Sequence, residues 1–254
     1  MIDVDRLVKT YGRVRAVDDV SFSVPQGRVV ALLGPNGAGK STTIKAITGL
    51  LRPSAGHVRV GGFDLERAPL GAKALLGYVP DRPYLYQKLT GRELLRFLGR
   101  LRRVADAERK AEAWLAHFGL ERSANELIET YSHGMRQKLT FAAALLHEPQ
   151  ALVIDEPMVG LDPRAAHDVR RLMRAAAEGG AAVLLTTHSM DVAEAVADSV
   201  LLLDRGRVRA MGTMTELRAR VGRSDASLEA IFLQLTDQAA DDRAAATARD
   251  GAAA

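Results

Sequence analysis

Short apolar runs alternate along the chain with segments whose apolar positions recur at helical spacing. Four of these runs have the length and composition of buried strands, and they cover Val29–Leu33, Ala151–Ile154, Ala182–Leu185 and Val200–Leu203. Helical patterns lie between and beside them, at Lys40–Leu50, Met135–Leu146, Pro163–Ala177 and Asp191–Ala197. This alternation predicts an α/β fold with a parallel sheet covered by helices.

Other segments depart from this pattern. Leu7–Gly12 and Val17–Val24 predict strands joined by a tight turn, and His57–Gly62 predicts a further strand and turn. We therefore expect a flanking antiparallel β layer beside the parallel core.

The middle of the chain, residues about 91–147, has a helical pattern almost throughout. It contains Trp114 and the Arg-dense stretch Arg92–Arg109, whose arginines we interpret as the solvent-facing side of helices. We predict a helical subdomain inserted between strands of the core. The polar, Ala-rich residues 238–254 are predicted to be a disordered tail, which leaves one folded domain over residues 1–237.

The amino-acid composition excludes several kinds of functional site. The 254 residues include no Cys, which excludes disulfides, thiolate metal sites and a cysteine nucleophile. The net charge of +4 is too small to indicate nucleic-acid binding without a clustered basic face, so no nucleic acid is expected. Acidic residues at the N-terminus argue against a signal peptide, and no apolar run has the length of a membrane-spanning helix. We expect that any membrane role would require a partner chain.

A glycine-rich segment between the first buried strand and the next helix fits the phosphate-loop motif G-x-x-x-x-G-K-[ST]. Its residues are Gly34, Pro35, Asn36, Gly37, Ala38, Gly39, Lys40, Ser41 and Thr42. The glycines allow backbone amides to converge on an anion, and the following helix N-terminus favours phosphate. Lys40 supplies a positive charge, and the Ser41 hydroxyl is a suitable ligand for Mg²⁺. The segment predicts binding of a nucleoside triphosphate on a P-loop NTPase core.

Two carboxylates follow the second buried strand. Asp155 and Glu156 come directly after an apolar run, which places them at the carboxyl edge of the predicted sheet, where α/β proteins bind ligands. Asp155 is predicted to hold Mg²⁺, and Glu156 is predicted to polarise an attacking water as general base. Taken alone, the pair also fits a strand that runs into an acidic turn.

The segment Tyr131–Gln137, with the sequence Tyr-Ser-His-Gly-Met-Arg-Gln, resembles the signature Leu-Ser-Gly-Gly-Gln of ATP-binding cassette (ABC) ATPases. Other elements of that family occur in the expected order, and the resemblance covers about residues 1–237. It implies that Tyr11 stacks on adenine, that Gly160-Leu161-Asp162 is the loop after the acidic pair, and that His188 is the switch histidine. Without the resemblance, Tyr11 would be a turn-flanking tyrosine and His188 a structural hydrogen-bonding group.

The sequence differs from the family pattern at two places in the predicted ATP site. His133 and Met135 replace a Gly and the Gln of the signature, whereas Ser132 and Gly134 remain, a variation that resembles exporter-type ATPases. Asp81 stands where the family has Gln, so it either contacts the metal with a full charge or points away. Beside it, a segment at 85–93 resembles the loop that contacts the membrane partner.

The resemblance implies that ATP with Mg²⁺ is sandwiched between two such subunits, with Lys40, Ser41 and Asp155 positioning the triphosphate and His188 holding its γ-phosphate. Ser132 and Gly134 of one subunit would then face the phosphate loop of the other, in a homodimer or a heterodimer. A separate transmembrane permease would place the chain at the cytoplasmic face of the cell membrane, with export as the favoured direction.

Two other functions are weighed against a transporter ATPase. A soluble ABC-type ATPase that acts on nucleic acid or ribosomes is the main alternative, but such relatives usually carry paired cassettes or a long coiled-coil insertion. A regulatory nucleotide-binding module without turnover is disfavoured by the presence of Glu156 and His188.

Overall fold

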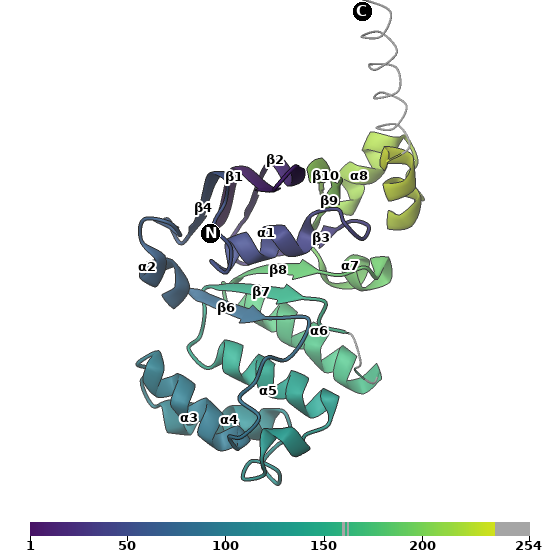
Figure 1. Cartoon of the computed structure of the whole chain (residues 1–254). Helices are drawn as coiled ribbons and strands as arrows, with labels where there is room; N and C mark the ends of the chain where they lie inside the picture. Colours follow the sequence, from purple (N-terminus) through teal and green to yellow (C-terminus); the bar gives the residue numbers. More distant parts are fainter. Residues whose placement is uncertain (159–160, 162, 237–254) are drawn as a thin grey trace, which may run out of the picture.

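The computed structural model of the chain describes residues 1–158, 161 and 163–236. Its elements form layers, with a small antiparallel sheet on one side of a central sheet and a group of helices on the other (Figure 1). The predicted α/β fold, with a parallel core and an antiparallel layer, is confirmed.

The central sheet has six strands in the order β10-β9-β3-β8-β7-β6. Neighbouring strands are parallel from β9 to β6, and β10 pairs with β9 in the antiparallel sense. The strands are β3 (Val29–Leu33), β6 (Leu76–Val79), β7 (Ala151–Asp155), β8 (Ala182–Thr186), β9 (Ser199–Asp204) and β10 (Arg207–Gly212). Every residue of β3, β7 and β8 is buried, which agrees with their unbroken apolar composition.

Two strands of this sheet were not among the predicted ones. β6 has four residues, and Gly77 and Tyr78 interrupt its apolar character. β10 is an edge strand in which arginines alternate with apolar residues. Neither strand shows the continuous apolar run that identifies a strand buried on both faces.

The second sheet is antiparallel, with the order β2-β1-β4-β5. Its strands are β1 (Ile2–Tyr11), β2 (Val14–Val24), β4 (Ala55–Val60) and β5 (Phe63–Asp64). β1 begins earlier than predicted because Ile2 and Val4 are buried and pair with β2.

Helices α1 (Lys40–Ile47) and α2 (Pro69–Ala74) lie on the side of the antiparallel sheet. Ile44 and Ile47 of α1 share one apolar core with residues of both sheets. The helix ends at Ile47 rather than at the predicted Leu50, because Gly49 follows with a left-handed φ of 65°.

The opposite face of the central sheet is covered by α5 (His133–Leu145) and α6 (Pro163–Glu178). Along β8, Val183 and Leu185 pack on this side, whereas Leu184 packs on the α1 side. Helices α3 (Gly91–Leu101) and α4 (Ala107–His117) and the 3₁₀ helix η1 (Ile128–Thr130) join α5 in a helical group (Figure 1). The exact bounds of the inserted subdomain stay a prediction.

The last described elements pack beside β9 and β10. They are α7 (Met190–Val196), α8 (Met214–Val221) and a further helix at residues 228–236. The predicted tail 238–254 lies outside the described residues.

Candidate functional site

The phosphate loop joins β3 to α1 and lies against other parts of the fold. Gly37 and Gly39 have left-handed φ values of 80° and 102°. A Cβ at Gly39 would lie 2.6 Å from the carbonyl oxygen of Ala16, and one at Gly34 would lie 2.1 Å from that of Leu203. Tertiary packing as well as loop conformation therefore requires glycine here.

The remaining loop residues surround a free helix N-terminus. Pro35 and Asn36 are exposed, and Ala38 is buried and accepts a hydrogen bond from the Gly206 amide at 2.8 Å. Gly39 caps α1, and no side chain of a described residue caps it. The exposed Ser41 and half-buried Thr42 lie in the first turn, where amide groups and the helix dipole favour an anion.

Lys40 folds back into the loop. Its ammonium group donates hydrogen bonds to the carbonyl oxygens of Gly34 at 2.6 Å and Pro35 at 3.1 Å. Burial lowers the pKa of Lys40, and the charges of Glu156 and Asp155 act in the opposite direction. The phosphate loop and the acidic pair are thus close enough to interact electrostatically.

Asp155 ends β7 as a buried carboxylate. It accepts a short hydrogen bond from the Thr186 hydroxyl on the neighbouring strand β8. Burial raises the pKa of Asp155, and the negative charges of Asp81 and Glu156 raise it further. The crowding of three carboxylates creates a place that a cation would stabilise.

Glu156 and His188 form a hydrogen-bonded pair that sequence analysis did not foresee. His188 Nδ1 lies 2.8 Å from Glu156 Oε2, and the backbone amide of His188 donates to the same oxygen at 3.3 Å. The Glu156 side chain is 21% exposed and that of His188 is 70% exposed. The pair holds the carboxylate at the rim of the sheet while leaving the imidazole accessible.

The signature residues lie at the start of α5. Ser132 caps this helix by accepting a hydrogen bond from the Met135 amide at 3.2 Å. A Cβ at Gly134 would have no neighbour within 4 Å, so this part of the helix end is open. Because α1 and α5 cover opposite faces of the central sheet, the two predicted phosphate-binding segments belong to different layers of one chain.

Tyr11 ends β1, with 48% of the residue exposed and Lys9 Nζ 5.3 Å from its ring centroid. Its ring is accessible for stacking. Of the predicted loop Gly160-Leu161-Asp162, the first and last residues lie outside the described part of the chain.

Asp81 lies beside the acidic pair. Its carboxylate accepts a hydrogen bond from the Arg82 amide at 2.8 Å and remains exposed. With Glu156, His133 and Arg136 it lines a cleft of about 590 Å³. Its negative charge raises the pKa of Asp155, so the two carboxylates are close enough to interact electrostatically.

The donor set fits a magnesium ion that arrives with phosphate. Ser41 and Asp155 offer hard oxygen ligands, and Asp81 adds a second carboxylate nearby. Among the described residues, no cluster of three or more His, Cys, Asp or Glu forms a metal cage. Mg²⁺ typically keeps water and phosphate ligands in addition to one or two protein groups.

Two residues of the site were missed. Thr186 donates to Asp155 and is also 3.3 Å from the Glu156 amide. The sequence did indicate a polar position here, because the pair Thr186-Thr187 follows an apolar run and precedes His188. Gly206 supports the phosphate loop from the turn after β9, and no local pattern links the two segments.

Residues 17–159 match the ABC transporter family. The linearmycin resistance ATP-binding protein LnrL of Bacillus subtilis is 38% identical over 224 residues, which cover 87% of this chain and 72% of LnrL. The daunorubicin/doxorubicin resistance ATP-binding protein DrrA of Streptomyces peucetius is 41% identical over 223 residues, which cover 87% of this chain and 68% of DrrA.

Solved structures of ATP-binding cassettes are similar to this chain as well. An ATP binding subunit of an ABC transporter has a TM-score of 0.89 and 39% identity, covering 93% of this chain and 99% of that chain. The dimeric, post-hydrolysis state of an ATP-binding cassette bound to ADP and Pi has a TM-score of 0.77 and 26% identity, covering 84% of this chain and 99% of the cassette.

The chain belongs to the ABC transporter family. Within it, this ABC protein is an ATP-binding, ATP-hydrolysing subunit, which confirms the function inferred from the sequence. The comparisons favour this function over the nucleic-acid or ribosome alternative. No helix in the described part of this ABC subunit is long and apolar enough to cross a membrane.

Proposed function

We propose that this ABC subunit hydrolyses MgATP with Glu156 as general base and powers export through a separate membrane permease. The observation that carries the proposal is the pairing of Glu156 with His188 beside Asp155, where β7 and β8 end. A carboxylate held at two points on the rim of a phosphate site is placed to accept a proton from an attacking water.

The phosphate loop supplies the anion site. Amides of Gly34–Thr42 would cradle the phosphates, and Lys40 would exchange its two carbonyl partners for phosphate oxygens. Ser41 and Asp155 would hold magnesium, which when bound neutralises phosphate charge. Asp81 lines a cleft with Glu156, and its carboxylate is proposed as an additional contact in that shell.

The proposed sandwich uses a second ABC subunit, either another copy or a different cassette. Ser132 and Gly134 lie at an open helix N-terminus, and α5 covers the sheet face opposite the phosphate loop. The helix end is therefore available to the ATP of a partner. Tyr11 would stack on adenine with its exposed ring, and the imidazole of His188 would contact the γ-phosphate.

An exposed apolar patch supports a permease partner. We define the α3 patch as Tyr84, Tyr86, Phe97 and Leu101, whose exposed fractions are 80%, 63%, 46% and 66%. Tyr86 and Phe97 meet edge to face with ring centroids 6.0 Å apart, so the segment before α3 and α3 itself meet in this patch. The patch overlaps the segment that resembles a permease-contacting loop, and contiguous exposed apolar surface is typical of protein interfaces.

The names of two relatives support export as the direction of transport. LnrL and DrrA are named for resistance to linearmycin and to daunorubicin and doxorubicin, which supports export of a toxic compound by this system. The subunit would then work at the cytoplasmic face of the cell membrane, docked on its permease.

The substitution Glu156→Gln tests the proposal. The amide keeps the shape of the side chain but accepts a proton poorly, so we expect turnover to fall by about 10²–10⁴-fold while ATP still binds. Steady-state ATPase assays measure turnover, and size-exclusion chromatography with MgATP should detect a stabilised dimer.

The control is Glu229→Gln, an exposed glutamate in the helix at 228–236. This variant should hydrolyse ATP and elute as the unmodified chain does. Wild-type turnover in Glu156→Gln would show that Glu156 is not the base.

A further inference from the structure

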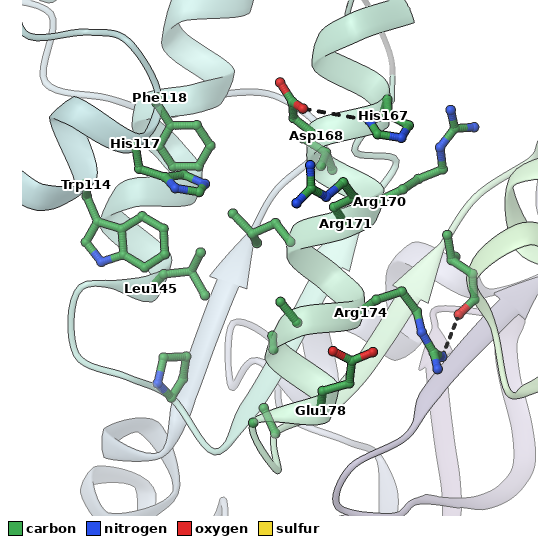
Figure 2. A pocket seen from close by; sticks show the side chains of 18 of the residues that line it. Trp114, His117, Phe118, Leu145, His167, Asp168, Arg170, Arg171, Arg174 and Glu178 are labelled. Carbon is green, nitrogen blue, oxygen red and sulfur yellow. Dashed lines mark hydrogen bonds and ion pairs between the residues drawn. The ribbon is translucent and has the colours of Figure 1, made fainter.

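A larger cavity of about 1500 Å³ lies between the helical group and α6 (Figure 2). Its lining comes mainly from α4, α5, α6 and the turns around residues 149 and 180. The phosphate loop, Asp155, Glu156 and His188 do not line it. The cavity is therefore separate from the proposed ATP site.

One wall of the cavity is aromatic. The Trp114 and Phe118 rings stack with centroids 5.8 Å apart and planes inclined by 22°. His117 meets both rings edge on. Trp114 is only half-buried, so part of the indole remains accessible to a planar apolar group.

The opposite wall carries arginines of α6, as Figure 2 shows. Arg174 pairs with Asp198 at 3.1 Å, and Arg170 likewise points away from the aromatic wall in Figure 2. Arg171 points toward the aromatic wall and forms no ion pair or hydrogen bond with any described residue. The acidic lining residues are Glu148, Asp168 and Glu178. Glu148 pairs with Lys110 at 2.9 Å, and Asp168 lies 3.8 Å from His167 Nδ1. This wall therefore offers the guanidinium group of Arg171 to an anion.

A buried amide provides a third recognition group. Gln137 of α5 lines the cavity and is 1% exposed. Its Oε1 atom accepts no hydrogen bond from the residues that the structure describes. Buried polar atoms are normally paired, so a ligand hydroxyl or N–H group would complete this one.

We propose that this cavity binds a planar aromatic carboxylate of two or more fused rings that also bears a hydrogen-bond donor. The rings lie against Trp114, the carboxylate pairs with Arg171, and the donor reaches Gln137.

Such a ligand would join two parts of the ABC subunit. It would contact α4 and α5 of the helical group on one side and α6 on the other. Ligand binding to the folded state alone stabilises a protein by mass action, so occupancy should raise the melting temperature.

The test uses 6-hydroxy-2-naphthoate and its neutral analogue 6-hydroxy-2-naphthamide on the full chain. Calorimetry measures affinity and stoichiometry. Trp114 is the single tryptophan of the chain, so its emission reports whether the probe sits in this cavity. We expect one naphthoate per chain, quenched Trp114 emission, and at least tenfold weaker binding of the amide, since charge-assisted pairs are the strong ones.

Variants locate the recognition groups. Arg171→Gln should weaken naphthoate at least tenfold and leave the amide unchanged. The matched control is Arg220→Gln on α8, an exposed arginine outside the cavity, which should bind both probes normally. Gln137→Leu should weaken 6-hydroxy-2-naphthoate but not 2-naphthoate. If this variant fails to fold, the affinities of the unmodified chain for these two probes test the same contact.

Equal affinity for naphthoate and amide, normal naphthoate binding by the Arg171→Gln variant, or unquenched Trp114 would each overturn the proposal. Quenching by an acidic peptide but not by naphthoate would overturn it in favour of a protein partner. The arginine variants should keep their ATPase rate, so this result is independent of the proposed role of Glu156.

Discussion

Gly39 has a backbone conformation and a neighbour that both exclude a side chain. Its φ is 102°, and a Cβ would lie 2.6 Å from the Ala16 carbonyl oxygen. Gly37 has a φ of 80° but open space around the same position. Substitutions at these two glycines therefore distinguish the cost of the left-handed backbone from the cost of the steric contact with Ala16.

We predict that Gly39→Ala lowers ATP affinity at least tenfold and is the more destabilising of the two alanine variants. Gly37→Ala should cost about 1–2 kcal/mol from the left-handed backbone alone, whereas Gly39→Ala must also displace the strand that carries Ala16. Calorimetric titration with ATP and urea unfolding measure these quantities. Equal losses in both variants would mean that the contact with Ala16 has no influence.

At the scale of elements, Asp198 connects β9, β3 and α6. Its carboxylate accepts hydrogen bonds from the Val29 amide at 2.7 Å and from Arg174 at 3.1 Å. Burial by itself raises the pKa of Asp198, but these hydrogen bonds outweigh it and the net shift is downward. The ionised carboxylate therefore stabilises the junction of three elements.

Because the pKa of Asp198 is lower in the folded than in the unfolded state, its stabilisation is present above about pH 3.9, the ordinary value for Asp, and is lost as pH falls further. We predict that Asp198→Asn lowers the free energy of unfolding by about 1–3 kcal/mol at pH 7. The difference from the unmodified chain should shrink below about pH 3.9.

Urea unfolding at several pH values measures this effect. The control is Asp225→Asn, which changes an exposed aspartate with no bonded partner among the described residues. A loss of stability that is constant from pH 7 to pH 3 would contradict the role given to the Asp198 charge.

At the scale of the whole molecule, the nucleotide site and the α3 patch belong to different parts of the fold. The phosphate loop and Asp155 lie on the central sheet, whereas Phe97 and Leu101 lie on the helical group. Segment 81–87 contains Tyr84 and Tyr86 of the α3 patch, and its Asp81 lines a cleft with Glu156. This segment offers a direct physical connection between the acidic pair and a docked partner.

We predict that Tyr86→Ser combined with Phe97→Ser prevents association with the permease while the isolated subunit keeps its ATPase activity. The reason is that both rings are exposed and lie outside the nucleotide site. Co-expression with the permease, followed by membrane sedimentation, measures association. Leu70→Ser on α2, at a position that is 84% exposed, is the control and should still sediment with membranes.

The sequence by itself determined the features that are local along the chain. The phosphate loop, the acidic pair, the cap at Ser132 and the strongly apolar strands each depend on neighbouring residues, whose spacing encodes turns, helix ends and buried strands. β6 and β10 were not predicted from the sequence. β6 is short and its apolar run is interrupted, and β10 is an edge strand with polar residues.

Only the tertiary structure decided which distant residues meet. The pairing of Glu156 with His188 and of Asp155 with Thr186 exists because β7 and β8 are neighbours in the sheet, although long segments separate them in sequence. The cavity between Trp114 and Arg170 likewise depends on how the helical group packs beside α6. Contacts of this kind follow from strand order and layer packing, which no local spacing of residues specifies.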